Sequence, residues 1–271
     1  MTLPACISSW GYREWFNAGK VDLLGFLDEV RRQKANGLEI FPAHVDADRY
    51  AAHLKEVARK AKALKLVISS LIVGNDFALP TAAGRAEHVE KMTRAIHGAA
   101  AAGIRRLNVF TGHHHDGQDP EMETARVIDA FREVCPLAET KRVVLCLENH
   151  SSVHPDVDGL LWIIRAVGSR ALKTNPDPTN FCRNYVERSD REREVIYTAT
   201  EKYAPAAANL HLKIRDFKPN GEHAHCDVKR LAAIFAKARY RGPVVLEYHG
   251  GDDPAEPNAR GLKLIRRHFG T

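Results

Sequence analysis

The sequence has few cysteines, no paired cysteine motif and no long hydrophobic run. Its five cysteines are an odd number, and no two of them form a CxxC pair. This argues against a disulfide framework and is typical of ordinary thiols in a reducing compartment. No apolar run approaches the 18 residues of a transmembrane helix, and the start, MTLPACISSWGY, lacks the charged and apolar regions of a secretory signal. We therefore expect a cytoplasmic protein without a membrane partner.

Neither sign of charge is concentrated in one segment. Forty Lys and Arg residues against 34 Asp and Glu residues give a net charge of +6, spread along the chain. No basic block resembles a nucleic-acid-binding tail, so no nucleic-acid partner is expected. The motifs GxGxxG and GxxxxGK[ST] are also missing, and with them the usual first turn of a nucleotide-binding α/β fold.

What the chain does have is a regular alternation of short β-rich runs and longer helical patterns. The runs predict strands at 5–9, 37–41, 66–72, 104–110, 142–148, 171–175, 207–214 and 243–248. Apolar residues at helical spacing predict helices at 21–35, 47–64, 81–102, 120–140, 156–168, 190–203, 227–239 and 255–268. Three glycines that follow helical patterns are expected to adopt the left-handed conformation that ends a helix, namely Gly37, Gly103 and Gly242.

Eight consecutive βα units favour a closed barrel over an open doubly wound sheet. Runs such as VVLCL are apolar on both faces, as parallel strands covered by helices are. Repeated units of one strand and one helix give parallel pairing with right-handed crossovers. We predict a single domain over residues 1–271, an α/β protein with the (β/α)8 TIM barrel fold, whose usual length is about 250 residues.

Four strands in the second half each carry one metal-ligand side chain at or near their end. They are Glu148 in VVLCLENH, Asp177 in LKTNPDP, His211 in ANLHLKIRD and Glu247 in PVVLEYHG. Any one of them alone could be a salt-bridge partner or a core residue. Glu148 and Glu247, however, end apolar strands where an unpartnered carboxylate is costly. Three carboxylates and one imidazole on one rim suit a hard divalent cation such as Mg²⁺ or Mn²⁺.

Further polar residues extend from strand ends toward the same rim. His150 and His249 each stand two residues beyond a strand-end glutamate, Lys213 and Arg215 continue the alternation of the seventh strand, and Glu39 lies at the end of the second. Each is a candidate to bind substrate, and for each the alternative is a solvated loop or core position.

Several segments resemble the xylose isomerase-like barrel superfamily, in particular its sugar epimerase and sugar-phosphate isomerase/epimerase branch. They are SSLIVGNDFALP, LCLENH, NPDPTNF, HLKIRDF and YRGPVVLEYHGGDDP, and the resemblance covers nearly the whole chain. It implies one divalent metal ion, Mn²⁺ first and Mg²⁺, Co²⁺ or Zn²⁺ as alternatives, held by Glu148, Asp177, His211 and Glu247. It also implies a small-molecule carbohydrate substrate and a homodimer or homotetramer.

The resemblance to ketose epimerases further implies catalytic roles. Glu148 and Glu247 would remove and return the proton next to a carbonyl, while the metal stabilises the enediolate. Asn180 lies three residues after Asp177, where relatives carry His or Asn, and would bind a substrate hydroxyl. The expected protein is a divalent-metal-dependent isomerase or epimerase of a ketose, keto-sugar or sugar phosphate.

Three alternatives stay open. The same base and metal could expel a β-substituent, which would make the protein a lyase or dehydratase of the inosose dehydratase or 3-keto-glycoside (C-glycoside deglycosidase) type. Endonuclease IV, a DNA repair enzyme of the same superfamily, needs more histidines, although His113, His223 and His225 could imitate some of them. A noncatalytic sugar-binding barrel would share the fold without the chemistry.

Overall fold

The computed structural model describes residues 3–150, 153–154, 156–251 and 253–270, and within these ranges eight strands form one parallel sheet. The strands are β1 (Ala5–Ser8), β2 (Gly37–Ile40), β3 (Val67–Ile72), β4 (Arg106–Val109), β5 (Val144–Glu148), β6 (Leu172–Asn175), β7 (Leu210–Ile214) and β8 (Val244–Tyr248). Their order in the sheet is β6-β5-β4-β3-β2-β1-β8-β7. Strands that follow one another in the chain therefore pair, except β6 and β7, and β8 pairs with β1, so that the sheet curls round. The predicted (β/α)8 TIM barrel is confirmed.

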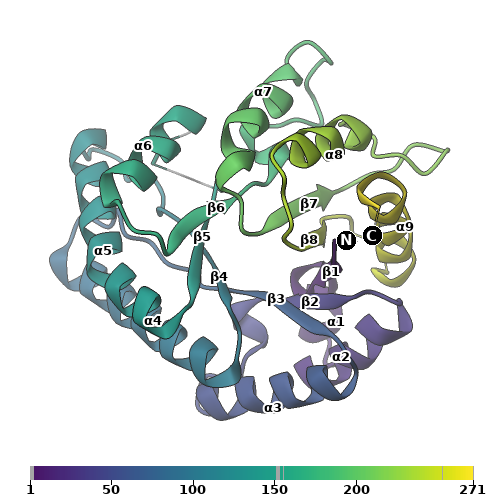
Figure 1. The fold of residues 1–271 in the computed structure, drawn as a ribbon, viewed down its shortest axis with the longest axis horizontal. Helices are drawn as coiled ribbons and strands as arrows, with labels where there is room; N and C mark the ends of the chain where they lie inside the picture. Colours follow the sequence, from purple (N-terminus) through teal and green to yellow (C-terminus); the bar gives the residue numbers. More distant parts are fainter. Residues whose placement is uncertain (1–2, 151–152, 155, 252, 271) are drawn as a thin grey trace.

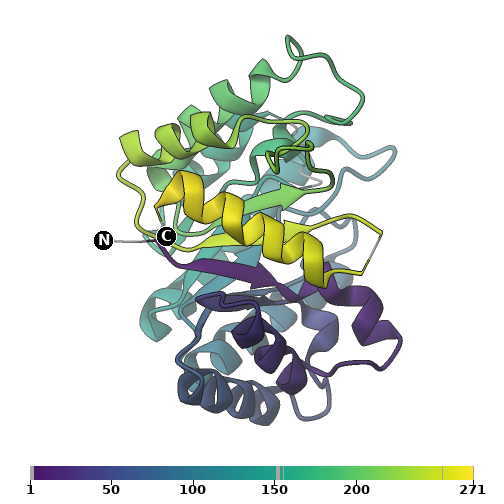
Figure 2. The ribbon, with the colours of Figure 1, turned by 90° about the vertical axis from the view of Figure 1, so that its right-hand side faces the viewer.

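Helices surround the strands on the outside (Figure 1). They are α1 (Arg13–Asn17), α2 (Leu23–Arg32), α3 (Tyr50–Ala63), α4 (Ala82–Ala102), α5 (Pro120–Lys141), α6 (Val157–Val167), α7 (Glu194–Tyr203), α8 (Val228–Lys237) and α9 (Ala255–Phe269). The last of these, α9, packs against β8 and β1, across the junction where the last strand meets the first (Figure 2). No helix in the described ranges is long and apolar enough to cross a membrane.

The sheet is most weakly joined between β6 and β7. Among the described residues this seam carries one isolated bridge, between Thr174 and Ala207, and no ladder. Two backbone hydrogen bonds join the two sides near this bridge. The backbone N–H of Ala208 donates to the Thr174 carbonyl at 2.9 Å, and the N–H of His211 donates to the Pro176 carbonyl at 2.9 Å. The second bond fixes His211 next to the segment that carries Asp177.

Alternation along β5 shows how a strand directs a polar side chain into the barrel. Leu145 and Leu147 belong to the main apolar core, whereas Cys146 lies outside that cluster although it is fully buried. Successive strand residues point to opposite faces of a sheet, so Cys146 and Glu148 share the inner face. Glu148 is therefore the last inward-facing residue of β5, at the carboxyl end of the strand.

Candidate functional site

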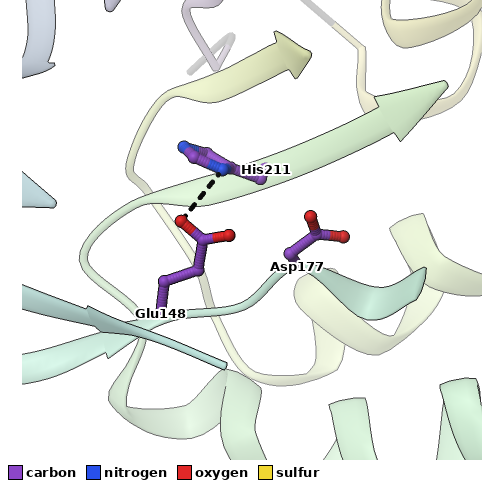
Figure 3. A group of neighbouring side chains, drawn as sticks. All are labelled: Glu148, Asp177 and His211. Carbon is purple, nitrogen blue, oxygen red and sulfur yellow. Dashed lines mark ion pairs between the residues drawn. The ribbon is translucent and has the colours of Figure 1, made fainter. Parts of the chain in front are cut away.

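Three of the predicted ligands meet at the carboxyl ends of β5, β6 and β7. One ligand atom each from Glu148, Asp177 and His211 lies within 4.8 Å of the other two. Figure 3 shows the Glu148 carboxylate directed at the His211 ring, with Asp177 beside them. All three side chains are buried, and Glu148 retains 3% of its exposure. Two carboxylates and an imidazole, gathered in a buried site, form a donor set that suits a divalent cation.

Two atoms of this group, one on His211 and one on Asp177, lack hydrogen bonds among the described residues. His211 Nδ1 is buried without a hydrogen-bond partner and lies 3.5 Å from Glu148 Oε2. Asp177 Oδ2 is likewise buried without a hydrogen bond, although the Lys213 ammonium lies 2.8 Å from it. Buried polar atoms without partners are costly. His211 Nδ1 and Asp177 Oδ2 lie where a bound cation would contact both of them.

Glu247 stands at the edge of the group rather than inside it. Its Oε2 lies 3.9 Å from His211 Nδ1, outside the three-residue cluster. It is closer to the ring of His249, at 3.2 Å, and lies 3.9 Å from Lys213 Nζ. Its shortest ion-pair contact among the described residues is therefore with His249, which is not one of the predicted ligands. The structure thus brings together three of the four predicted ligands and places the fourth beside them.

Lys213 is a buried cation inside the site. It is 7% exposed, and its ammonium donates to Asn180 Oδ1 at 2.6 Å while it pairs with Asp177. Asn180 in turn donates to Glu148 Oε1 at 3.2 Å. Burial lowers the pKa of Lys213, but Asp177 and Glu247 outweigh this and hold the pKa above its usual value. Lys213 therefore carries a positive charge among three carboxylates.

Glu39 occupies a different place from the one expected of a substrate-binding residue. It is fully buried in β2, where its Oε2 shares a hydrogen bond of 2.9 Å with His211 Nε2 and accepts one of 2.5 Å from Ser70 Oγ. It lies behind the imidazole, on the side away from Glu148. A carboxylate in that position fixes the ring and leaves Nδ1 to face the centre.

Electrostatics keep both candidate acid/base glutamates ionised. Burial raises the pKa of Glu148, but His211 outweighs it and the pKa is lowered overall. Burial likewise raises the pKa of Glu247, yet Lys213, His249 and His211 bring it down to about 2. Both groups are therefore carboxylates near neutral pH and able to accept a proton.

Two asparagines that the sequence patterns did not single out hold the ligands in place. Asn108 in β4 donates to Glu148 Oε2 at 2.6 Å. Asn149 exchanges two hydrogen bonds with the backbone of Asp177, donating at 2.9 Å and accepting at 2.8 Å. Two signals in the sequence could have identified them. Asn108 occupies an inward-facing position of its strand, and Asn149 directly follows Glu148.

The outer candidates lie around the opening of the barrel. His150 is exposed, and its ring centre lies 5.6 Å from that of Phe110. Arg215 is exposed too, and with His249 it lines a cavity of about 370 Å³ between the loops that follow β7 and β8. His249 therefore borders this cavity on one side and Glu247 on the other.

Two of the three histidines that could have extended the site to a trinuclear centre, His223 and His225, are engaged elsewhere. His223 is buried, with Nε2 against the Lys213 carbonyl at 2.9 Å and Nδ1 accepting from the backbone N–H of His225 at 3.0 Å. His225 pairs with Asp216 at 3.2 Å. Within the described ranges the three-residue cluster is the one group of metal-ligand side chains. This argues against an endonuclease IV-like centre.

Comparisons with known proteins agree with the fold. No curated protein matches the chain. A D-psicose 3-epimerase from Clostridium cellulolyticum H10, solved with D-tagatose, is 16% identical at a TM-score of 0.77, covering 98% of this chain and 99% of that one. An L-ribulose 3-epimerase is 16% identical at 0.79, over 99% and 95%. The 3-keto-D-glucoside 4-epimerase YcjR from E. coli is 16% identical at 0.72, over 91% and 94%.

Likeness at this identity shows the fold alone, and the family follows from the sequence itself. The family described as xylose isomerase-like TIM barrel matches residues 27–268. That match spans most of the chain, including every strand from β2 to β8 and all the candidate ligands. The protein belongs to the xylose isomerase-like TIM barrel family.

Proposed function

We propose that this protein is a divalent-metal-dependent epimerase or isomerase of a ketose, keto-sugar or sugar phosphate. The observation that carries the proposal is the buried imidazole of His211, whose Nδ1 faces Glu148 at 3.5 Å and Glu247 at 3.9 Å. Two ionised carboxylates beside one ligand atom are what a two-base epimerisation needs. The sugar epimerases among the structural neighbours support the same class of reaction.

A hard divalent ion fits the donor set, with Mn²⁺ first among Mg²⁺, Co²⁺ and Zn²⁺. Glu148, Asp177 and His211 would hold it, with Glu247 as the fourth ligand. When bound, such an ion supplies positive charge that stabilises the enediolate oxygens as the adjacent carbon loses its proton. The remaining contributions come from the side chains of the chain itself.

Glu148 and Glu247 would act as the base and acid pair. They come from β5 and β8, two strands that are separated in the sheet, and can therefore approach a bound sugar from different sides. Hydrogen bonds from Asn108 and Asn180 fix one oxygen each of Glu148. A carboxylate held in this way cannot rotate away from the carbon it deprotonates, which preserves the orientation that catalysis requires.

Lys213 would balance the charge of the loaded site. The three carboxylates of Glu148, Asp177 and Glu247 and a divalent ion carry a net charge of −1, and the ammonium of Lys213 brings this inner group to zero, with Glu39 outside it behind the imidazole. An additional negative charge on the deprotonated sugar is then not repelled by the site. We also propose that Asn180, His150, Arg215 and His249 bind substrate hydroxyl or phosphate groups.

Glu39→Gln is expected to weaken Mn²⁺ binding about 10–100-fold, as loss of a group that orients a metal-bound histidine usually does. The amide accepts the His211 N–H less strongly and leaves the ring free to turn. Mn²⁺ titration followed by electron paramagnetic resonance measures the effect. Glu29→Gln, at a buried glutamate in α2, is the matched control and should leave Mn²⁺ affinity unchanged. A raised KM with normal Mn²⁺ affinity would instead show that Glu39 binds substrate, as the sequence predicted.

Elimination is the second candidate reaction, because the structure offers room for a leaving group. The cavity of about 370 Å³ adjoins His249, which contacts Glu247. A substituent expelled next to the deprotonated carbon would lie on this side of the site. A lyase or dehydratase acting on an inosose or a 3-keto-glycoside would use the same base.

Proton exchange separates the two reactions. The Mn²⁺-loaded protein is incubated in D₂O with a panel of ketoses, sugar phosphates, inososes and 3-keto-glycosides, and the products are analysed by NMR. We expect deuterium at the carbon next to the carbonyl without loss of a substituent. Release of water or an aglycone would select elimination. Sugar binding with neither exchange nor release would identify a noncatalytic barrel.

A further inference from the structure

A second cavity, at the opposite end of the barrel, is lined by arginine. It has a volume of about 420 Å³ and opens where the strands begin. Arg105 and Arg106 reach it from the start of β4, Arg142 from the residue after α5, and Arg239 and Arg241 from the segment before β8. Among the described residues that line it, none is Asp or Glu. The candidate active site lies at the carboxyl ends of the same parallel strands, so the two sites are separate.

These five arginines lack the acidic partners that arginines have elsewhere in the chain. None of them forms an ion pair with a residue in the described part of the structure, whereas Arg230 pairs with Glu194 at 2.8 Å. Arg106 is half-buried and points to the inner face of β4, because it shares the parity of Asn108. Even partial burial of a cation without a counterion is costly. The cavity therefore concentrates positive charge that the protein itself does not neutralise.

Helix dipoles explain only part of this charge. Arg142 and Arg239 follow α5 and α8 in the left-handed conformation, each with φ +56°, where a cation complements the carbonyl end of a helix. Arg105 and Arg106 lie at the start of a strand, and Arg241 lies beyond the helix end. Their convergence on one cavity needs another reason, and an anionic ligand provides it.

We infer that this cavity binds a small anion with two or more phosphate groups. Guanidinium groups pair with phosphate oxygens in bidentate fashion, and the volume falls within the range of small-molecule sites. Five positive charges exceed what a single phosphate neutralises. The arginines also come from both sides of the weakly joined β6–β7 seam, with Arg106 on the β4–β5 side and Arg239 on the β7–β8 side. The anion would bridge that seam.

Pyrophosphate titrated into the metal-free full-length chain tests the inference, since a metal-free protein offers no cation for pyrophosphate to chelate. Calorimetry at low ionic strength should give one saturable site per chain, with weaker binding of inorganic phosphate and a higher Tm when pyrophosphate is bound. Arg106→Gln should weaken the affinity about tenfold or more, as loss of a charge-assisted hydrogen bond does. The double variant Arg142→Gln/Arg239→Gln, at two exposed positions, should weaken the pyrophosphate affinity to a similar extent. It replaces Arg106→Gln in the test if that variant fails to fold.

The matched control removes the same charge elsewhere. Arg31→Gln/Arg59→Gln changes two exposed arginines on α2 and α3 that make no ion pair within the described ranges. It should leave the pyrophosphate affinity within twofold of the unmodified chain. The inference is overturned if the unmodified chain shows no saturable binding or if the control weakens binding as much as the cavity variants. A single-stranded oligonucleotide that binds ten times more tightly than pyrophosphate would also overturn it, in favour of nucleic acid.

Discussion

Glu247→Gln is expected to lower proton exchange at the carbon next to the carbonyl by about 10⁴-fold, the upper range for loss of a general base. The amide keeps the size of the side chain but cannot accept the proton. Glu247 is 9% exposed, and its pKa of about 2 keeps the side chain an ionised carboxylate, with an open site for the proton, across the physiological range. Exchange in D₂O, followed by NMR with Mn²⁺ in excess, measures the loss.

Comparison with Glu148→Gln separates the role of a base from that of a ligand. Glu148 belongs to the three-residue cluster and Glu247 lies at its edge. Glu148→Gln should therefore weaken Mn²⁺ binding more than Glu247→Gln does, although both abolish exchange. Glu90→Gln, on the exposed side of α4, is the control for the loss of one carboxylate. Full turnover by folded, metal-loaded Glu247→Gln would contradict the assigned role.

Most strands and helices of the barrel could be predicted, because each strand has a local sequence pattern of its own. Residues 142–148 and 243–248 carry apolar runs on both faces, the first ending in Glu148 and the second with Glu247 one residue before its end, and the structure has β5 and β8 there. Of the predicted helix ends, Gly103 adopts φ +74° as expected. Gly37 does not, because Lys34 takes the left-handed conformation instead. A glycine is needed at position 37 for a different reason, because a Cβ there would lie 2.0 Å from the Val67 carbonyl oxygen.

The contacts that Glu39 and Lys213 make with the candidate ligands could not be predicted, because they join residues that are distant in sequence. Glu39 and His211 meet across 172 positions, and no local pattern connects them. A glutamate at the end of β2 looks like any rim residue until the barrel closes and places it behind the imidazole. Lys213 was expected near the rim, but its contacts depend on Asp177 and Asn180, which reach it from the far side of the β6–β7 seam.

Removal of divalent ions is expected to abolish turnover, and Mn²⁺ is expected to restore it at one ion per chain. His211 Nδ1 is buried and, within the described ranges, lacks a hydrogen bond, while Asp177 Oδ2 faces the same centre and is paired with the Lys213 ammonium, so a cation would supply the partner that the imidazole nitrogen needs. Chelation and dialysis, then reloading with each metal, test this by activity and by elemental analysis. Asp177→Asn should weaken Mn²⁺ binding by more than about 100-fold, beyond the loss that removal of a merely orienting residue causes.

Lys213→Met tests the metal site further, because we expect it to strengthen Mn²⁺ binding and yet to lower turnover. The ammonium lies 2.8 Å from Asp177 Oδ2, the oxygen that a bound cation would use. Two positive charges compete for that oxygen, so loss of the ammonium should strengthen Mn²⁺ binding. Turnover should nevertheless fall, because the site is left with a net negative charge that repels the deprotonated sugar. Weaker Mn²⁺ binding in Lys213→Met would show instead that the lysine holds the ligands together, and undiminished turnover would exclude it from charge compensation.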